Sequence, residues 1–141
     1  MTSLADLLKI HEGFESHAYK CTANKTTIGI GRNIDPAGGI GITEAEALYL
    51  LNNDIDRCRL ELEIAFDFFK DLDPVRSDAC INMVFNLGLP VFKTFTNTLK
   101  YLSEGKWDKA ADAALDSKWA QQVGVRAFQV SEMIRTGKYP S

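Results

Sequence analysis

Glu12 is the first residue of the sequence whose position suits acid–base chemistry. It falls on the last turn of a short helix that we expect to begin after Ser3 and to end at Gly13. A carboxylate there faces the negative end of the helix dipole and the unpaired carbonyl groups, and both favour its protonated form. A general acid must donate from that form. A solvent-exposed glutamate that merely ends a helix has the same spacing, so position alone leaves both interpretations open.

Glu12 also stands in a spaced pattern with two later residues. Eight residues separate it from Cys21, and five more separate Cys21 from Thr27, which opens the segment TIGIG. The pattern resembles the catalytic signature of the phage lysozymes, the endolysins and muramidases of glycoside hydrolase family 24, whose middle residue is Asp or Cys. The resemblance continues in order along the chain through these segments: 81–86, Gly88, 95–99, 107–111, 117–119, Arg126 and 135–137.

The resemblance implies an enzyme that hydrolyses the β-1,4 bond between N-acetylmuramic acid and N-acetylglucosamine in bacterial peptidoglycan, and so causes host cell lysis. Glu12 would protonate the glycosidic oxygen as general acid. Cys21 and Thr27 would act on a water or on the sugar C1 from the opposite face, an inverting arrangement if the groups are far enough apart to admit the water. Thr27 suits this task because a hydroxyl both donates and accepts hydrogen bonds.

Cys21 leaves three roles open. An unperturbed thiol has a pKa of about 8.5 and is only slightly ionised at neutral pH, and a nearby ionised Glu12 would reduce that fraction further. The thiol could orient the water, its thiolate could be the nucleophile, or it could fill the position while Glu12 and Thr27 act. We expect participation, because the family pattern admits cysteine there. Cys58 and Cys80 fall on apolar helix faces and are expected to be structural.

The resemblance assigns three substrate-binding residues, Asn33, Phe85 and Thr98. Amide and hydroxyl groups suit recognition of sugar hydroxyl and N-acetyl groups, and an aromatic ring suits the apolar face of a sugar. Phe85 could equally be a core residue. The fourth binding position of the family, usually asparagine, falls on Ala113, so we expect that contact to be lost.

Three charged residues are expected to support the site. Arg126 matches a family arginine that approaches the catalytic glutamate across the cleft, although a surface arginine on a helix is the plain alternative. Arg32 takes the place of a histidine that pairs with an aspartate in relatives, and Asp54 matches that aspartate. We therefore predict an ion pair between Arg32 and Asp54.

Local sequence signals predict the elements that position the N-terminal candidate site residues. β-branched and turn residues over 18–31 predict a small hairpin with its turn at 23–25. The glycine-rich stretch 35–41 predicts a loop. A capping box at Thr43 and Glu46 opens a long helical pattern that we expect to bend or break near Ala65.

The rest of the sequence reads as helices. Asp73 and Pro74 begin a core helix that Gly88 ends, and shorter helices are expected at about 94–104, 107–115, 117–122 and 125–135. The fold class is thus α+β, mostly helical and lysozyme-like: a small N-terminal lobe with a β-hairpin, joined by a long helix to a helical C-terminal lobe. We expect one lysozyme domain over 1–141, with the N-terminal lobe at about 13–60 and the C-terminal lobe at about 61–141 together with the helix 3–12.

Composition limits the partners. The 141 residues carry a net charge of −3, which argues against a nucleic-acid binder that neutralises phosphates. Three cysteines and two isolated histidines predict neither a disulfide framework nor a metal site, so no cofactor is expected. The first residues show neither a secretion signal nor a membrane anchor. The resemblance accordingly implies a monomer in the host cytoplasm that binds peptidoglycan, without stable membrane association, after a separate holin opens the membrane.

Two other functions are compatible with these residues. A lytic transglycosylase needs only one catalytic glutamate, here Glu12. This class of enzyme would explain why the sequence lacks a second catalytic carboxylate. A lysozyme-like module that binds the cell wall could have weakened or lost catalysis at Cys21. The joint presence of Glu12, Thr27 and Arg126 argues against the second version.

Overall fold

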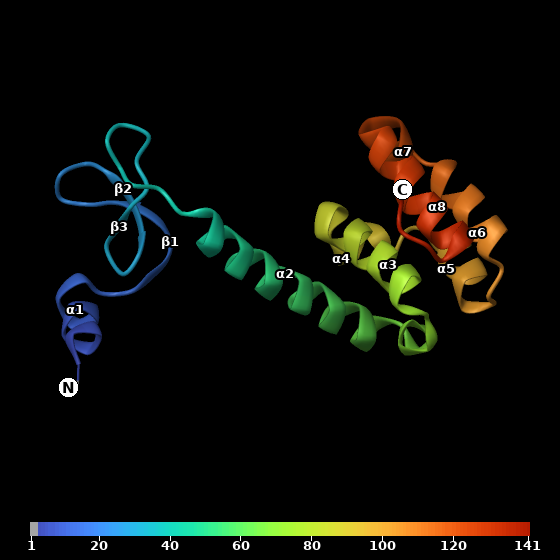
Figure 1. Ribbon diagram of the computed structural model, residues 1–141, viewed down its shortest axis with the longest axis horizontal. Coiled ribbons are helices and arrows are strands. Elements are labelled where there is room, and N and C mark those ends of the chain that lie inside the picture. Colours follow the sequence, from blue (N-terminus) through green and yellow to red (C-terminus); the bar gives the residue numbers. More distant parts are fainter. Residues whose placement is uncertain (1–2) are drawn as a thin grey trace. The chain divides into compact units, whose positions relative to one another are not determined.

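The computed structural model describes residues 3–141, so the first two residues of the predicted domain lie outside it. Within that range one short helix precedes a small sheet, and a series of helices follows it (Figure 1). The elements in chain order are α1 (Leu4–Glu12), β1 (Glu15–Lys20), β2 (Thr26–Gly29), β3 (Arg32–Asn33), α2 (Glu44–Ala65), the 3-10 helix η1 (Asp67–Asp71), α3 (Pro74–Leu87), α4 (Leu89–Phe92), α5 (Thr96–Ser103), α6 (Trp107–Leu115), α7 (Lys118–Val123) and α8 (Val125–Thr136). The predicted fold class, α+β and mostly helical, is confirmed.

The chain divides into two compact units, one ending at Leu50 and the other spanning Leu51–Ser141. The N-terminal unit contains α1, the sheet and the first turns of α2, and the C-terminal unit contains the rest of α2 and every later helix. The predicted lobes within a single domain stay a prediction. None of the helices described within 3–141 is long and apolar enough to cross a membrane.

Local capping signals set the first helix as predicted. The Ser3 side chain accepts a hydrogen bond from the backbone of Asp6, and Gly13 ends α1 with φ at +73°. Such a positive φ favours glycine because it has no Cβ to clash. Glu12 is therefore the last residue of α1.

The sheet extends the predicted hairpin by one strand. Its order is β1-β2-β3 and both pairings are antiparallel. Thr27 on the central strand lies opposite Tyr19 on one side and Asn33 on the other. The two residues of β3 gave too short a pattern to be recognised as a strand, because alternation needs about four residues to show.

The long helix begins and ends where the sequence predicted. The backbone of Glu46 donates to the Thr43 side chain at 3.1 Å, and the backbone of Thr43 donates to the Glu46 carboxylate at 2.9 Å, so the capping box is complete. The helix ends at Ala65 and η1 follows directly.

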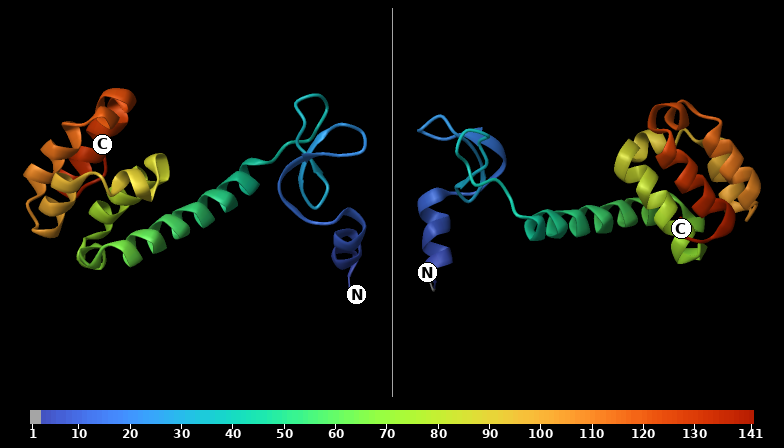
Figure 2. Two further views of the ribbon diagram at one scale, coloured as in Figure 1. Left: turned by 180° about the vertical axis from the view of Figure 1, so that it is seen from behind. Right: turned by 45° about the horizontal axis from the view of Figure 1, so that its top comes forward.

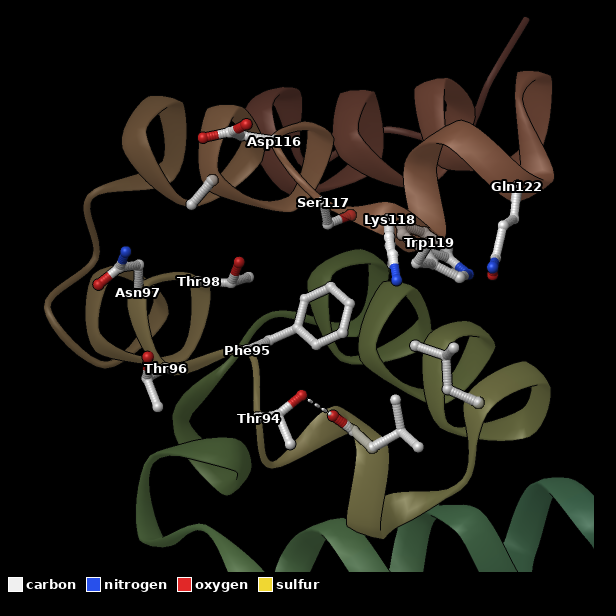
Figure 3. A pocket seen from close by; sticks show the side chains of 13 residues that line it. Thr94, Phe95, Thr96, Asn97, Thr98, Asp116, Ser117, Lys118, Trp119 and Gln122 are labelled. Atoms are coloured by element: carbon white, nitrogen blue, oxygen red, sulfur yellow. Dashed lines mark hydrogen bonds between the residues drawn. The ribbon is translucent and has the colours of Figure 1, made fainter.

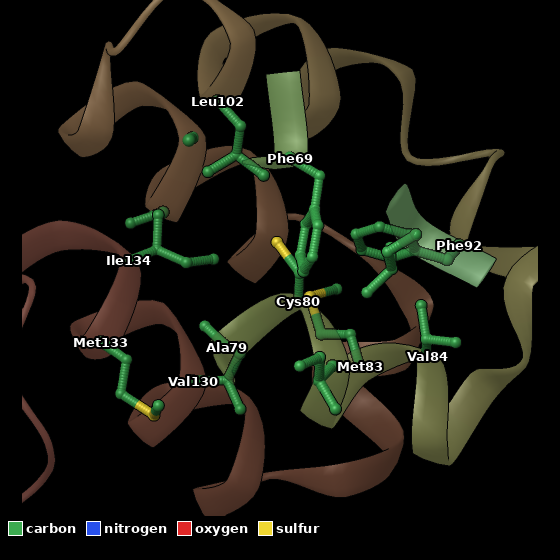
Figure 4. Close-up of a cluster of buried hydrophobic side chains, with 14 of the residues drawn as sticks. Phe69, Ala79, Cys80, Met83, Val84, Phe92, Leu102, Val130, Met133 and Ile134 are labelled. Atoms are coloured by element: carbon green, nitrogen blue, oxygen red, sulfur yellow. The ribbon is translucent and has the colours of Figure 1, made fainter. Parts of the chain in front are cut away.

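The main core lies in the C-terminal unit around α3. Asp73 caps this helix through the backbone of Arg76, and Gly88 ends it. Helix α8 packs against α3, α6 and α7 (Figure 2). Figure 4 shows the apolar side chains between these helices, which include Cys80, Met83, Phe92, Val130 and Ile134. The short helix α4, which contributes Phe92, was not predicted.

Cys58 and Cys80 are both buried in this core, as predicted for structural cysteines, and each is 1% exposed. Burial raises the pKa of the Cys80 thiol to about 12, because the low-polarity interior disfavours the thiolate. Neither thiol is therefore reactive in the folded protein.

Candidate active site

Glu12 lies against the turn that joins β2 to β3. A Cβ atom placed on Gly31 would come within 2.9 Å of Glu12 Oε2 and within 3.1 Å of its carboxyl carbon. Gly31 also has a φ of +72°, which L side chains rarely adopt. The glycine thus serves two purposes, since it makes the turn and it leaves room for the carboxylate. Sequence reasoning did not single out Gly31, although a glycine inside a β-branched segment indicates a close approach of another group.

Cys21 begins the loop between β1 and β2. Its backbone N–H donates to the Lys25 carbonyl at 3.0 Å, and its carbonyl accepts from the N–H of Asn24 at 2.8 Å. Asn24 adopts a left-handed conformation, with φ at 60°. The five residues 21–25 therefore form a tight, internally bonded loop with the partly exposed Cys21 side chain at its start.

This loop lowers the pKa of the Cys21 thiol below its usual range. Hydrogen bonding from the backbone of Lys25 is the largest cause, followed by the backbone of Ala23. These donors stabilise the thiolate more than partial burial disfavours it. The expected upward shift of the thiol pKa is thus wrong in direction, because the sequence did not reveal the backbone donors around the sulfur.

Thr27 occupies the centre of the sheet and is only 4% exposed. Its hydroxyl donates to the Lys25 carbonyl at 2.9 Å, the same oxygen that accepts from the Cys21 backbone. The structure therefore brings Cys21 and Thr27 together around one carbonyl group. Lys25 was not predicted as a site residue. It acts here through its backbone carbonyl, which the type of its side chain does not reveal.

Asn33 lies opposite Thr27 on β3 and organises the loop that follows. Its side-chain oxygen accepts from the backbone of Asp35 at 3.0 Å. Asp35 in turn accepts from the backbones of Thr26 and Ala37, and these hydrogen bonds lower the pKa of its carboxyl group. Asn33 is thus next to the Cys21 and Thr27 pair, but part of its amide is engaged in the fold.

Arg32 and Asp54 belong to different units and each has a partner within its own unit, so the ion pair between them stays a prediction. Arg32 binds Glu46 through both terminal guanidinium nitrogens, at 2.7 and 2.9 Å, and also donates to the Gly41 carbonyl at 3.0 Å. Asp54 pairs with Arg57 on its own helix at 3.3 Å.

In the C-terminal unit, Phe85 and Arg126 line one pocket of about 670 Å³. Phe85 is 46% exposed, so the core interpretation of this residue is wrong. Asn82 holds Arg126 in place: its side-chain oxygen accepts from Nε at 2.9 Å and its backbone carbonyl accepts from Nη2 at 3.3 Å. Asn82 was not predicted. Whether Arg126 pairs with Glu12 stays a prediction.

Thr98 lines a second pocket of the C-terminal unit, with a volume of about 440 Å³ (Figure 3). Ala113 lines the same pocket. Its methyl group offers no hydrogen bond where the family usually has an asparagine, in keeping with the predicted loss of that contact. The side chains of Phe95, Lys118 and Trp119 line the same pocket, and Figure 3 shows them.

Comparison with known proteins places the sequence among lysozymes. The profile of the family described as phage lysozyme matches residues 9–135. The probable T4-type lysozymes 1 and 2 of Dictyostelium discoideum are 31% and 30% identical, each over 97% of this chain and 96% of the relative. An endolysin of Acyrthosiphon pisum secondary endosymbiont phage 1 is 31% identical over 82% of this chain and 75% of its own length. The chain therefore belongs to the phage lysozyme family, whose members are lysozyme-like glycosidases of the bacterial cell wall.

Proposed function

We propose that this protein is an endolysin-type muramidase that hydrolyses the β-1,4 bond between N-acetylmuramic acid and N-acetylglucosamine in peptidoglycan. One observation carries the proposal: Cys21 and Thr27 share the Lys25 carbonyl at the start of β2, while Glu12 contacts Gly31 just beyond its end. An acid and a pair of water-directing groups thus flank the same short strand. The lowered pKa of the Cys21 thiol beside the buried Thr27 hydroxyl supports a chemical role for the pair.

In the proposed reaction, Glu12 donates its proton to the glycosidic oxygen as the bond to C1 breaks. No hydrogen bond joins the carboxylate to Cys21 or Thr27 among residues 3–141. An inverting mechanism requires the acid and the water-directing groups to stand far enough apart to admit the water.

Thr27 and Cys21 divide the work on the attacking water. The Thr27 hydroxyl donates its hydrogen to the Lys25 carbonyl, so its oxygen can accept a hydrogen bond from the water. The thiolate of Cys21 then takes the proton that the water loses as its oxygen attacks C1. A negative sulfur also favours the positive charge that develops on the sugar ring. Solvent returns a proton to Glu12 and removes one from Cys21 to complete the cycle.

Substrate contacts belong to the same proposal. Asn33 lies beside the catalytic pair, while Phe85 offers an exposed ring in the pocket that holds Arg126. Thr98 offers a hydroxyl in the second pocket. Arg126, fixed by Asn82, supports the charge of the reacting groups. We further propose that the protein acts as a monomer, is made in the host cytoplasm and reaches the wall through a holin to lyse the cell.

A digest of purified peptidoglycan tests the chemistry. Wild type, Glu12→Gln, Cys21→Ala and Cys21→Asp are incubated with it, and the released ends are identified by mass spectrometry. We expect reducing N-acetylmuramic acid ends, no product with Glu12→Gln, and activity with Cys21→Asp that equals or exceeds wild type. Full activity of Cys21→Ala would exclude participation of the thiol.

The same digest separates the alternatives. Ends of the 1,6-anhydro type would identify a lytic transglycosylase. A wild type that binds the wall without releasing fragments, and a Glu12→Gln variant that behaves identically, would identify a binding module.

A further inference from the structure

Asp35 joins the loop that follows β3 to the start of β2. Its Oδ1 accepts a hydrogen bond from the backbone N–H of Thr26 at 3.0 Å, and its Oδ2 accepts one from that of Ala37 at 2.9 Å. The Asp35 side chain is only 12% exposed. A carboxylate that is this enclosed and accepts two backbone N–H groups is held firmly, because charge-assisted hydrogen bonds are stronger than neutral ones.

Two lysines strengthen this junction. The ammonium group of Lys20 donates to the Thr26 hydroxyl at 2.9 Å and lies 3.9 Å from the Asp35 carboxylate. The ammonium group of Lys25 donates to the Ala37 carbonyl at 3.1 Å. Lys20 directly precedes the loop between β1 and β2, and Lys25 is the last residue of that loop. Both ends of the loop are therefore bound to the segment that contains Asp35.

The hydrogen bond from Thr26 to Asp35 fixes one particular peptide group. The Thr26 N–H and the Lys25 carbonyl belong to the same peptide group, which is planar and trans, so they point in opposite directions. The carbonyl accepts from the Cys21 backbone at 3.0 Å and from the Thr27 hydroxyl at 2.9 Å. Asp35 thus holds, from the opposite side, the peptide group around which Cys21 and Thr27 meet.

We propose that Asp35 is a positioning residue for the candidate catalytic pair, whose carboxylate fixes this peptide group and so keeps the 21–25 loop closed around the Cys21 sulfur. The inference rests on the proposed function, in which Cys21 and Thr27 direct the attacking water. The action of Asp35 is indirect, since it reaches the pair through the peptide group.

The charge of Asp35 by itself predicts the opposite effect on Cys21. A negative charge near a thiol disfavours the thiolate, so removal of the carboxylate should make ionisation of Cys21 easier. If Asp35 instead positions the loop, its removal loosens the backbone N–H groups of Lys25 and Ala23 that lower the pKa of the thiol. Ionisation then becomes harder. The direction of the change therefore distinguishes positioning from a through-space charge effect.

Alkylation of Cys21 by iodoacetamide measures this direction without requiring activity. The thiolate is the reacting form, so the rate follows the ionised fraction of the thiol. The rate is measured as a function of pH on folded protein, and peptide mapping isolates Cys21 from the two core cysteines. Two variants are compared with wild type. Asp35→Ala removes both acceptor oxygens, whereas Asp35→Asn keeps one oxygen and replaces the other with an NH2 group, which cannot accept.

We expect Asp35→Ala to slow alkylation at pH 7 by about 3- to 10-fold, because weaker hydrogen bonds to the sulfur reduce the thiolate fraction. The pH of half-maximal rate should rise as well. Asp35→Asn should slow alkylation by about 2- to 3-fold, since it loses only one of the two acceptors. Asp35→Asn decides the question alone if Asp35→Ala does not fold. A rate that stays at the wild-type value or increases would overturn the proposal.

Glu46→Gln is the matched control for lost stability. Glu46 is also a paired carboxylate of the N-terminal unit, but its partners are Arg32 and the backbone of Thr43 rather than the 21–25 loop. Its replacement should leave the alkylation rate of Cys21 at the wild-type value. Equal slowing by Glu46→Gln and by the Asp35 variants would show a general loosening of the unit, and the proposal would fail.

A kinetic cycle with Cys21→Asp connects the positioning role to catalysis. The carboxylate that this substitution introduces is ionised at neutral pH without help from the loop. We therefore expect Asp35→Asn to lower kcat by about 3- to 10-fold in wild type and by much less in Cys21→Asp. An equal loss of kcat in both backgrounds would contradict an action through the thiol.

Failure of the proposed function gives a different result from failure of this inference. If Cys21→Ala digests peptidoglycan as fast as wild type, the thiol takes no part in the reaction. The alkylation rates of the Asp35 variants still decide in that case whether Asp35 positions the loop.

Discussion

Replacing Gly31 by alanine tests whether the contact with Glu12 matters for catalysis. The new Cβ would lie 2.9 Å from Glu12 Oε2 and 3.2 Å from Cγ, closer than side-chain atoms normally approach. The carboxylate must therefore move away from the turn. Gly29 provides a matched control, because its φ of +70° is nearly that of Gly31 and a Cβ placed on it would meet no atom within 4 Å.

Both substitutions carry the same backbone strain, since alanine disfavours a positive φ by about 1 to 2 kcal/mol. For a chain of this size we expect each variant to melt about 3 to 8 °C below wild type. Only Gly31→Ala also displaces the general acid. A misplacement of about 1 Å can cost on the order of 100-fold in rate, so we expect Gly31→Ala to lose about 10- to 100-fold in kcat and Gly29→Ala to lose little.

The assay is release of soluble fragments from purified peptidoglycan, measured well below the melting temperature of each variant so that all are folded. Thermal unfolding by circular dichroism supplies the stability comparison. If Gly29→Ala and Gly31→Ala lose the same activity, backbone strain alone explains the loss. If Gly31→Ala is less stable but fully active, Glu12 does not act from the position described.

Three further predictions concern other residues. Ser131→Ala should raise the free energy of unfolding by about 1 kcal/mol, because Ser131 is fully buried with an unpaired hydroxyl; a lower melting temperature would reveal a hidden partner. Iodoacetamide at neutral pH should modify Cys21 first and abolish activity, while Cys58 and Cys80 react only after unfolding; peptide mapping would contradict this if a core cysteine reacts first. Arg32 holds the pKa of Glu46 at about 2, below its ordinary 4.5, so the ionised carboxylate stabilises the fold above pH 4.5 and that contribution is lost as the pH falls toward 2. Glu46→Gln should therefore lower the melting temperature at pH 7 but not at pH 2, and a constant difference would refute the pairing.

Local signals in the sequence determined most of the elements. The caps at Ser3, Thr43 and Asp73 each begin a helix where predicted, because a cap depends on residues three positions apart. Helix ends at Gly13 and Gly88 followed for the same reason. The family resemblance, which depends on residue types and their order, also came from the sequence alone.

Pairing between segments was decided only by the tertiary structure. The sequence did not show which carboxylate of the N-terminal unit Arg32 binds, and the folded unit pairs it with Glu46 at 2.7 Å. It left Phe85 open between core and surface, and the helices around α3 left the ring exposed.

The candidate catalytic residues show the same division. Their types and spacing were enough to propose an acid and a water-directing pair. The lowered pKa of Cys21 and the approach of Glu12 to Gly31 depend on a loop and a turn closing around them. A thiol is stabilised by the backbone donors that reach it in space, and their positions exist only once the chain has folded.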